Sequence, residues 1–349
     1  MNPPELAAAL PYSGCDNPRE FLKRLEVRSD PISLALVEIH GRVARKVQEW
    51  KPFVCPDIRA AREFTREIVA KAKADFLAER AGGSEALDLC AGPGGDTLAL
   101  AEHYDVKAVD REVPRIEALK INARLHAGHA VEVIELDVME AELDADVVHA
   151  DPGRSGAKDP KRTEPPATEL RDMFSEVPHM IEVPPAVKPR PGTVVFSATG
   201  EVRSVCWTNL TEKVAAVIAE TSAVLEGLPR KPTEALEPEE VRYVIEQDPA
   251  VRKANLSWKL AEELNVHPTV VAGEETVLAS EDPPDLTVDH VIRVVEVGEE
   301  GDGPPTIRSL GVKLNPRRLA ELRKTYKEYD IVYVTKAGVL AGKVIYERE

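Results

Sequence analysis

The spacing of hydrophobic residues differs between the first part of the chain and the rest. From about residue 18 to residue 80, apolar residues recur every three or four positions, and this spacing predicts helices. Pro31 interrupts the first helical stretch, and Asp57 precedes the next one as an N-cap would. The glycines of Ala-Gly-Gly at 81–83 are typical of a helix end. The sequence therefore predicts an N-terminal helical segment over residues 1–83.

From about residue 85, short apolar runs alternate with helical stretches. The first four runs are EALDLC, VKAVDR, VEVIELD and DVVHADP, and TVVFSATGE and VRSVCWTNL follow after a proline-rich loop. Strands and helices that alternate in this way predict parallel strands joined by crossover helices. We therefore expect an α/β fold over residues 84–230, with a Rossmann-like, doubly wound and mostly parallel sheet.

A stretch rich in proline and charge, GLPRKPTEALEPEE, suggests a boundary near residue 230. Beyond it, residues 241–265 are expected to be helical. The run HVIRVVEV, the helical PRRLAELRKTY and the hairpin-like DIVYVTKAGVLAGKVIYER follow. These patterns predict linker helices and a small α+β domain over residues 231–349.

Composition narrows the classes of partner. The formal net charge is −16 at pH 7, so any nucleic-acid site has to be a local basic patch on an acidic body. No apolar run approaches the ~20 residues of a membrane-spanning helix, and no membrane partner is expected. The four cysteines form no C-x-x-C pair, so neither a metal site nor a disulfide framework is expected. A cytoplasmic protein with reduced thiols is the simplest interpretation.

A glycine-rich turn lies between the first predicted strand and the first crossover helix. Its glycines are Gly92, Gly94 and Gly95, and Asp88 stands just ahead of them. The spacing D-x-x-x-G-x-G-G differs from the G-x-G-x-x-G of nicotinamide enzymes, in which the turn faces a pyrophosphate. A carboxylate at Asp88 would repel a pyrophosphate and attract an ammonium group. S-adenosylmethionine (SAM) carries an ammonium group and no phosphate, and it is the cofactor that we expect.

Each of the first four predicted strands ends at or near an aspartate. Asp110 lies 18 positions after Gly92, where an acidic residue would accept hydrogen bonds from ribose hydroxyls. Arg111, the next residue, is expected to belong to the same cofactor site. Asp137 and Val138 follow the third strand and would hold the adenine. Asp151 ends the fourth strand, at the sheet edge where ligands bind in open α/β folds.

Each of these residues also has a purely structural interpretation. A single aspartate at a strand end often caps a helix or forms a turn. Cys90, within the glycine-rich turn, is expected to line the cofactor site as a small buried side chain and not to act as a nucleophile. The ordered set, one aspartate per strand, favours a SAM site.

At these residues the sequence resembles class I SAM-dependent methyltransferases. More closely, it is similar to a bacterial family in which a methyltransferase domain precedes a THUMP-like C-terminal domain. The similarity begins at about AREFTRE (61–67), includes DLCAGPGGD (88–96) and DADVVHADPGR (144–154), and continues through LEPEEVRYVIEQDPAVRKANLSWKLAEELN to TIRSLGVKLNPRRLAELRK. REFTRE followed by DLCAGPGGD also resembles trimethylguanosine synthases. That second resemblance implies that Phe64 and Thr65 close over the methionine end of SAM.

The fourth strand leads into the expected catalytic motif, Asp151-Pro152-Gly153-Arg154. Amino-methylating relatives have Asp/Asn-Pro-Pro and then an aromatic residue, and here no aromatic follows. The resemblance implies that Asp151 and a nearby carbonyl accept the hydrogens of a target amine. Arg154 would hold a base plane or a phosphate.

Several functions stay open on the sequence. RNA is the expected acceptor, through an exocyclic amine or ring nitrogen, because a basic loop at 153–162 adjoins the motif. A second basic stretch surrounds the helix at 316–326, and a solvated helix face is its simpler explanation. The alternatives are a methyltransferase for a small molecule or protein, and a SAM-binding protein without catalysis. A nicotinamide enzyme is disfavoured because its glycine spacing is absent.

Overall fold

The computed structural model describes residues 31–127, 131–140, 143–153, 162–272 and 274–348. The chain divides into two compact units. Unit 1 comprises Met1–Val187 with Ser204–Leu210, and unit 2 comprises Lys188–Arg203 with Thr211–Glu349. The domain ranges expected from the sequence, 1–83, 84–230 and 231–349, stay predictions. Within the described ranges, no helix combines the length and apolar character that crossing a membrane requires.

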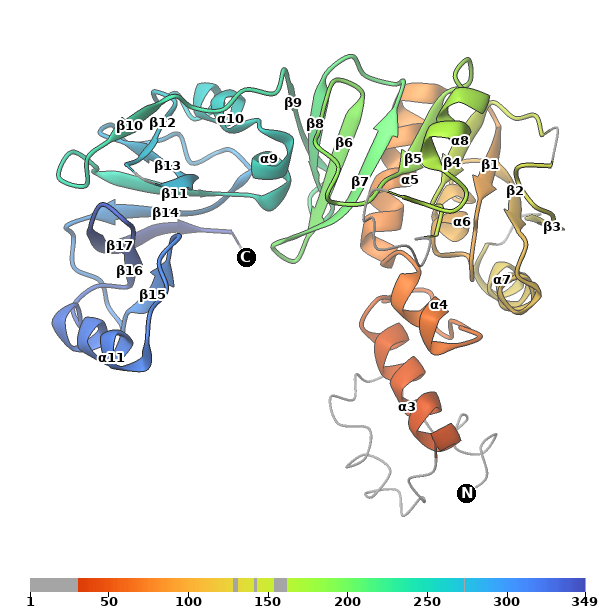
Figure 1. Ribbon diagram of the computed structural model, residues 1–349, viewed down its shortest axis with the longest axis horizontal. Helices are drawn as coiled ribbons and strands as arrows, with labels where there is room; N and C mark the ends of the chain where they lie inside the picture. Colours follow the sequence, from red (N-terminus) through yellow and green to blue (C-terminus); the bar gives the residue numbers. More distant parts are fainter. Residues whose placement is uncertain (1–30, 128–130, 141–142, 154–161, 273, 349) are drawn as a thin grey trace. The chain divides into compact units, whose positions relative to one another are not determined.

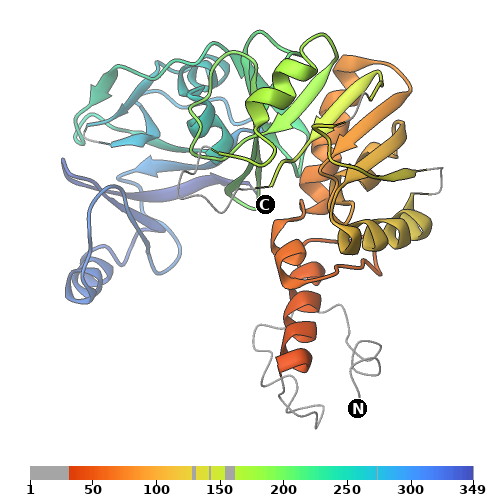
Figure 2. The same ribbon diagram turned by 45° about the vertical axis from the view of Figure 1, so that its right-hand side comes forward.

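Three helices precede the sheet of unit 1: α3 (Pro31–Ala44), α4 (Ile58–Glu63) and α5 (Glu67–Ala81). Asp57 is the N-cap of α4, since its side chain accepts a hydrogen bond from the Ala60 amide, as predicted. Gly82 follows α5 with φ of +68°, a conformation that favours glycine and confirms the predicted helix end. In both views α3 lies farther from the strands than α5 does (Figures 1 and 2).

The strands of unit 1 form a mostly parallel sheet in the order β3-β2-β1-β4-β5-β7. They are β1 (Glu85–Leu89), β2 (Asp105–Asp110), β3 (Glu132–Glu135), β4 (Val147–Ala150), β5 (His179–Glu182) and β7 (Glu201–Thr208), of which residues 204–208 belong to unit 1. β7 runs antiparallel to β5, and the other neighbours are parallel. The carboxyl ends of five parallel strands therefore share one edge. This arrangement confirms the predicted α/β class and doubly wound sheet.

The crossover helices of unit 1 are α6 (Gly95–Leu100), α7 (Val113–His126) and α8 (Ala167–Met173). Helix α7 packs on β2 and β3, α8 packs on β5, and α5 packs on α6 (Figure 1). The side chains of β4 are buried at every position, and those of β1 are buried after its first residue. Central parallel strands are covered on both faces, which explains their nearly continuous apolar sequence.

Unit 2 contains two groups of strands. In the first, β6 (Thr193–Ala198) and β8 (Val214–Ile218) are parallel and β9 (Ala223–Gly227) is antiparallel to β8. The second is an eight-stranded sheet in the order β10-β12-β13-β11-β14-β17-β16-β15. Its strands are β10 (Glu234–Leu236), β11 (Tyr243–Gln247), β12 (Thr269–Val271), β13 (Glu274–Ser280), β14 (Val291–Val297), β15 (Thr306–Ser309), β16 (Ile331–Val334) and β17 (Val339–Glu347). The helices of unit 2 are α9 (Pro249–Ala254), α10 (Ser257–Glu263) and α11 (Pro316–Thr325).

The eight-stranded sheet corrects one prediction from the sequence. Residues 241–265 were expected to be helical throughout, but Tyr243–Gln247 form strand β11, which pairs with β13 on one side and β14 on the other. Pairing on both sides buries Val244 and Ile245, whose β-branched side chains suit a strand better than a helix. Helix begins only at Pro249, where the Asp248 side chain caps α9. The predicted hairpin is confirmed, since β16 and β17 are antiparallel.

Candidate functional site

The turn between β1 and α6 needs glycine for two separate reasons. Gly94 has φ of +99°, and a Cβ atom there would lie 2.4 Å from Cδ1 of Leu119. A Cβ atom at Gly95 would lie 3.0 Å from the carbonyl oxygen of Thr65. Cys90 also has a positive φ, +62°, which is uncommon for a residue with a side chain. The turn is therefore shaped by close approach of other segments, as well as by backbone conformation.

The segment that approaches Gly95 contains Phe64 and Thr65, two residues that the sequence assigned to the same site. The Phe64 ring stacks on Phe53 with centroids 4.8 Å apart. The Thr65 hydroxyl donates to Asp96 at 2.6 Å, and Lys46 donates to the carbonyl oxygen of Phe64. The structure thus brings this segment and the glycine turn together, although 27 residues separate Thr65 from Gly92 in the sequence.

A pocket of about 530 Å³, which includes the open space at its mouth, lies at the carboxyl edge of β1, β2 and β3. Five of the residues predicted to bind the cofactor line it: Cys90, Asp110, Arg111, Asp137 and Val138. The other lining residues are Arg59, Glu112, Arg115, Leu136, Gly153, Glu164 and Pro165. Residues at the ends of three different strands therefore line one pocket that is open to solvent.

The carboxylates that line this pocket are held by protein donors. Asp110 accepts hydrogen bonds from the amides of Gly92 and Glu112, each at 2.8 Å. Asp137 accepts from the amide of Met139 at 3.1 Å and from the guanidinium of Arg111 at 3.3 Å. These bonds fix the direction of both carboxylates, and each oxygen keeps a further lone pair for a ligand donor.

Asp88 does not line the pocket, and only 1% of its surface is exposed, compared with 6% for Asp110. One of its oxygens accepts from the Thr97 hydroxyl at 2.5 Å, and the other lies 2.8 Å from Nδ1 of His149. Both oxygens therefore already have protein partners. A direct contact between Asp88 and an ammonium group stays a prediction.

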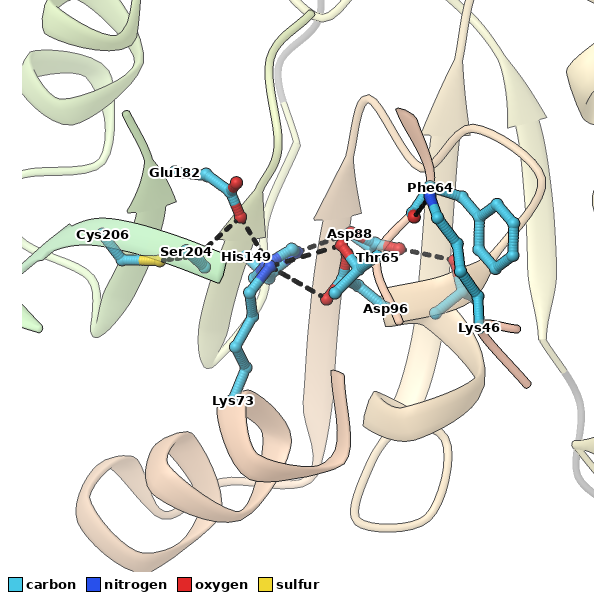
Figure 3. Close-up of polar contacts among 11 residues, drawn as sticks. Lys46, Phe64, Thr65, Lys73, Asp88, Asp96, His149, Glu182, Ser204 and Cys206 are labelled. Atoms are coloured by element: carbon cyan, nitrogen blue, oxygen red, sulfur yellow. Dashed lines mark hydrogen bonds and ion pairs between the residues drawn. The ribbon is translucent and has the colours of Figure 1, made fainter. Parts of the chain in front are cut away.

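Asp88 begins a network of charged side chains on one face of the sheet (Figure 3). Asp88 and His149 are in register on β1 and β4, so their side chains point to the same face. Lys73 of α5, 1% exposed, donates to Asp96 at 3.2 Å and to Glu182 at 2.7 Å. Helices α5 and α6, which carry Lys73 and Asp96, pack together over this face.

The pKa values of this network follow from its burial and its pairing. Burial alone would lower the pKa of Lys73, but the carboxylates of Asp96 and Glu182 raise it well above the ordinary 10.5. Burial would likewise lower the pKa of His149, and Asp96 together with Asp88 raises it above 6.5. For Asp96, burial acts to raise the pKa, and Lys73 and His149 outweigh it and lower the pKa. Lys73 and Asp96 are therefore ionised at neutral pH, and Asp96 and Asp88 favour the protonated form of His149.

Asp151 directly follows β4, and its amide donates to the carbonyl oxygen of Leu89. Among the described residues, no donor forms a hydrogen bond with its carboxyl group. Burial and the neighbouring Glu182 carboxylate raise the pKa of Asp151 well above 3.8. Pro152 is buried. Arg154, the weaker part of the predicted catalytic motif, lies outside the described residues, as does most of the basic loop at 153–162.

Cys90 is partly exposed and lines the pocket. Burial and the adjacent Asp110 raise the pKa of its thiol, so the thiol stays protonated and is a poor nucleophile. In the described ranges, no three His, Cys, Asp or Glu side chains are grouped so as to hold a metal ion.

Sequence reasoning missed four members of the buried network: Lys73, Asp96, His149 and Glu182. Weak signals were present. Lys73 lies four positions from both Val69 and Leu77, which are buried, so it occupies the apolar stripe of its helix. His149 interrupts the wholly buried strand β4. A polar residue on an apolar stripe calls for a partner, but the sequence does not say which partner.

Comparison with known proteins supports the fold. No protein-family model matches the chain, and no curated protein sequence matches it. The fold matches a crystal structure described as a "putative methyltransferase from Porphyromonas gingivalis W83", with a TM-score of 0.65 and 16% sequence identity. The match covers 99% of this chain and 95% of that chain. At this identity the similarity establishes the fold, and it agrees with the predicted methyltransferase-type α/β architecture.

Two further similarities are partial. The tRNA (uracil-54, C5)-methyltransferase of Pyrococcus abyssi, with S-adenosyl-L-homocysteine, has a TM-score of 0.28 and 20% identity over 34% of this chain and 29% of that chain. An RNA methyltransferase of Salinibacter ruber, also with S-adenosyl-L-homocysteine, has a TM-score of 0.25 and 22% identity over 32% of this chain and 73% of that chain. Similarities at this level carry no argument about function.

We predict that Lys73→Met destabilises unit 1 strongly, because it leaves the Asp96 and Glu182 carboxylates without their buried cation. Breaking a buried pair from one side costs about 3–5 kcal/mol. Lys120→Met is the matched control, since Lys120 lies on α7 of the same unit and its ion pair with Glu117 is exposed to solvent. That change should cost about 1 kcal/mol or less. Urea unfolding curves measure both, and equal losses would contradict the assigned role of Lys73.

A second prediction concerns pH. The folded-state pKa of His149 is raised above 6.5, so its stabilising contribution is complete below about pH 6.5 and is lost as the pH rises through the raised pKa. The difference in unfolding free energy between wild type and His149→Gln should therefore be largest at acidic pH and should shrink on raising the pH. His103→Gln, at an exposed histidine–aspartate pair, serves as the control. A His149→Gln difference that grows with pH would refute the ionised state of His149.

Proposed function

We propose that this protein is a SAM-dependent methyltransferase. The observation that carries the proposal is the pocket at the carboxyl edge of β1, β2 and β3, because five independently predicted cofactor residues line it. The sequence order of these residues, one group after each strand, is the order in which the resemblance to class I enzymes assigns their roles. SAM, when bound, supplies a methyl group that its sulfonium already activates.

The residues present fit this cofactor. Asp110 has both oxygens oriented by backbone amides, and its free lone pairs suit the two hydroxyls of a ribose. Val138 is buried and presents an apolar wall beside the Asp137 carboxylate, a combination that suits an adenine ring with its amino group. Phe64 and Thr65, which pack against Gly95, would cover the methionine end.

A nicotinamide cofactor fits less well. Its pyrophosphate would have to lie at the turn before α6. That helix has only six residues, and Asp96 occupies its first turn. A carboxylate at this place opposes the binding of an anion.

The acceptor site is proposed to lie at Asp151. Of the four strand-end aspartates, Asp88, Asp110 and Asp137 have protein hydrogen-bond donors, whereas no described residue donates to the Asp151 carboxyl group. A carboxyl group with free hydrogen-bond acceptors, placed next to the methyl donor, suits the binding of an amine. Methyl transfer mainly requires that the nucleophile be held in line, which is a task of positioning.

RNA is the acceptor class that we propose. Helix α11 in unit 2 is anchored by the buried Leu322, and four exposed cations on it and just before it have no carboxylate partner among the described residues: Lys313, Arg317, Arg323 and Lys324. By contrast, Arg318 pairs with Glu321. On a protein with net charge −16, such a concentration of unpaired cations favours a polyanionic partner. The assignment of this region as THUMP-like is part of the same proposal.

Mass spectrometry of RNA nucleosides from cells with and without the gene tests this function. The proposal expects one methylated nucleoside to disappear without the gene and to be restored by purified protein with SAM. A protein or small-molecule product in place of a nucleoside would reject RNA as the acceptor. Binding of SAM without any transfer would reject catalysis.

We predict that Asp110→Ala weakens SAM binding by about 1.5–3 kcal/mol, because hydrogen bonds to a charged acceptor are lost. Asp105→Ala, at the opposite end of β2 and exposed, is the control and should leave the affinity unchanged. Isothermal titration calorimetry measures both variants. An unchanged affinity of Asp110→Ala for SAM would show that Asp110 only forms a turn and does not bind the ribose.

A further inference from the structure

Two carboxyl groups meet where β4 and β5 end. These parallel strands pair with Ala150 opposite Ile181, so the next residues, Asp151 and Glu182, follow in the same register. Residues in register on neighbouring parallel strands point to the same face, and the strands lie about 4.8 Å apart. Asp151 and Glu182 are therefore neighbours on the face that also carries His149.

The two carboxyl groups have unequal surroundings. Glu182 Oε2 accepts from Lys73 at 2.7 Å and from the Ser204 hydroxyl at 2.7 Å (Figure 3). No described donor reaches Glu182 Oε1, and 23% of this side chain is exposed. Asp151 accepts no hydrogen bond from any described residue. Lys73 and the Ser204 hydroxyl bond directly to Glu182, whereas Lys73 and His149 act on Asp151 only through their charge, without a hydrogen bond.

The other charged groups around the pair do not change this inequality. Lys73 and Asp96 form one ion pair and His149 and Asp88 another, on helices and strands adjoining the site. Lys46, although it interacts with Asp151 electrostatically, donates to the carbonyl oxygens of Arg62 and Phe64. The thiols beside Asp151, Cys90 and Cys206, are uncharged, because burial raises the pKa of each.

We propose that Asp151 and Glu182 hold one proton between them at neutral pH, on Asp151, and that this pair binds the acceptor amine. Lys73 is the positioning residue that keeps the negative charge on Glu182. Two adjacent carboxyl groups with one cation do not both ionise readily. The raised pKa of Asp151 agrees with this arrangement. The binding of an acceptor amine by this pair rests on the proposed methyl transfer, whereas the shared proton is a property of the protein alone.

A carboxylic acid beside a carboxylate presents one donor and several acceptors. This is the complement of an amine next to an unprotonated ring nitrogen, as in adenine or cytosine, whereas the corresponding edge of guanine presents two donors. During transfer, the acceptor nitrogen bonds to the methyl carbon while the carbon–sulfur bond breaks and its electron pair stays on sulfur. The surplus proton on nitrogen passes to the Glu182 carboxylate and then to water. Asp151 keeps its own proton throughout.

Infrared spectroscopy tests the shared proton without any substrate. The wild-type protein should show the C=O stretching band of a protonated carboxylic acid at pH 7, and Asp151→Asn should lack it. Glu182→Gln removes the neighbouring negative charge while Lys73 stays paired with Asp96, so the midpoint at which this band disappears should fall by about one pH unit or more. Glu176→Gln, at an exposed carboxylate ahead of β5, is the matched control and should keep the wild-type midpoint.

Absence of the band in wild type, or an unchanged midpoint in Glu182→Gln, would overturn the proposal. Transfer of labelled methyl groups from SAM to total RNA of cells lacking the gene tests the acceptor. We expect methylation of an adenine or cytosine amine, with kcat reduced at least tenfold in Glu182→Gln and SAM affinity within twofold of wild type. A methylated guanine amine would refute the role given to the pair. If wild type transfers no methyl group, the proposed function fails, and the infrared result still decides the shared proton.

Discussion

The charge of Lys73 lies in the interior of unit 1, and much of that unit is arranged around it. Burying an ammonium group costs several kcal/mol unless carboxylates and hydrogen-bond acceptors replace the lost water. Asp96 and Glu182 supply the carboxylates, from a helix and a strand that lie far from Lys73 in the sequence. The ion pairs are satisfied only when α5, α6 and β5 all have their native positions. The network therefore favours one packing of helices on the sheet over alternatives that a purely apolar core would tolerate.

The four strand-end aspartates differ in their hydrogen-bond partners and in their relation to this network. The Asp88 carboxylate contacts Thr97 and His149 through hydrogen bonds, and these contacts link β1, β4 and α6. Asp110 and Asp137 are oriented by backbone amides and keep free lone pairs toward a pocket. Asp151 alone of the four lacks a described donor. A regular sequence pattern, one aspartate per strand, thus covers three different physical situations.

Sequence reasoning succeeded where the determining interactions are local. Three features depend on residues close together in the chain and could be predicted from the sequence. They are the alternation of strands and helices, the N-cap at Asp57 and the glycine turn. Lys73 could not be assigned in this way, because its partners lie 23 and 109 residues away. Strand β11 was missed for a related reason. Its pairing partners, β13 and β14, lie about 30 to 50 residues further along the chain.

A site that handles a proton needs one group that titrates and others that do not. Lys73 meets the second condition, because the two carboxylates raise its pKa far from neutral pH. Asp96 meets it as well, since its pKa is lowered by the same cation and by His149. The fixed charges therefore define the local potential, and Asp151 is the carboxyl group left to respond to pH or to a ligand. On this view the missing aromatic residue after Asp151-Pro152 is compensated electrostatically, because a donor–acceptor pair can orient a base edge that no ring stacks upon.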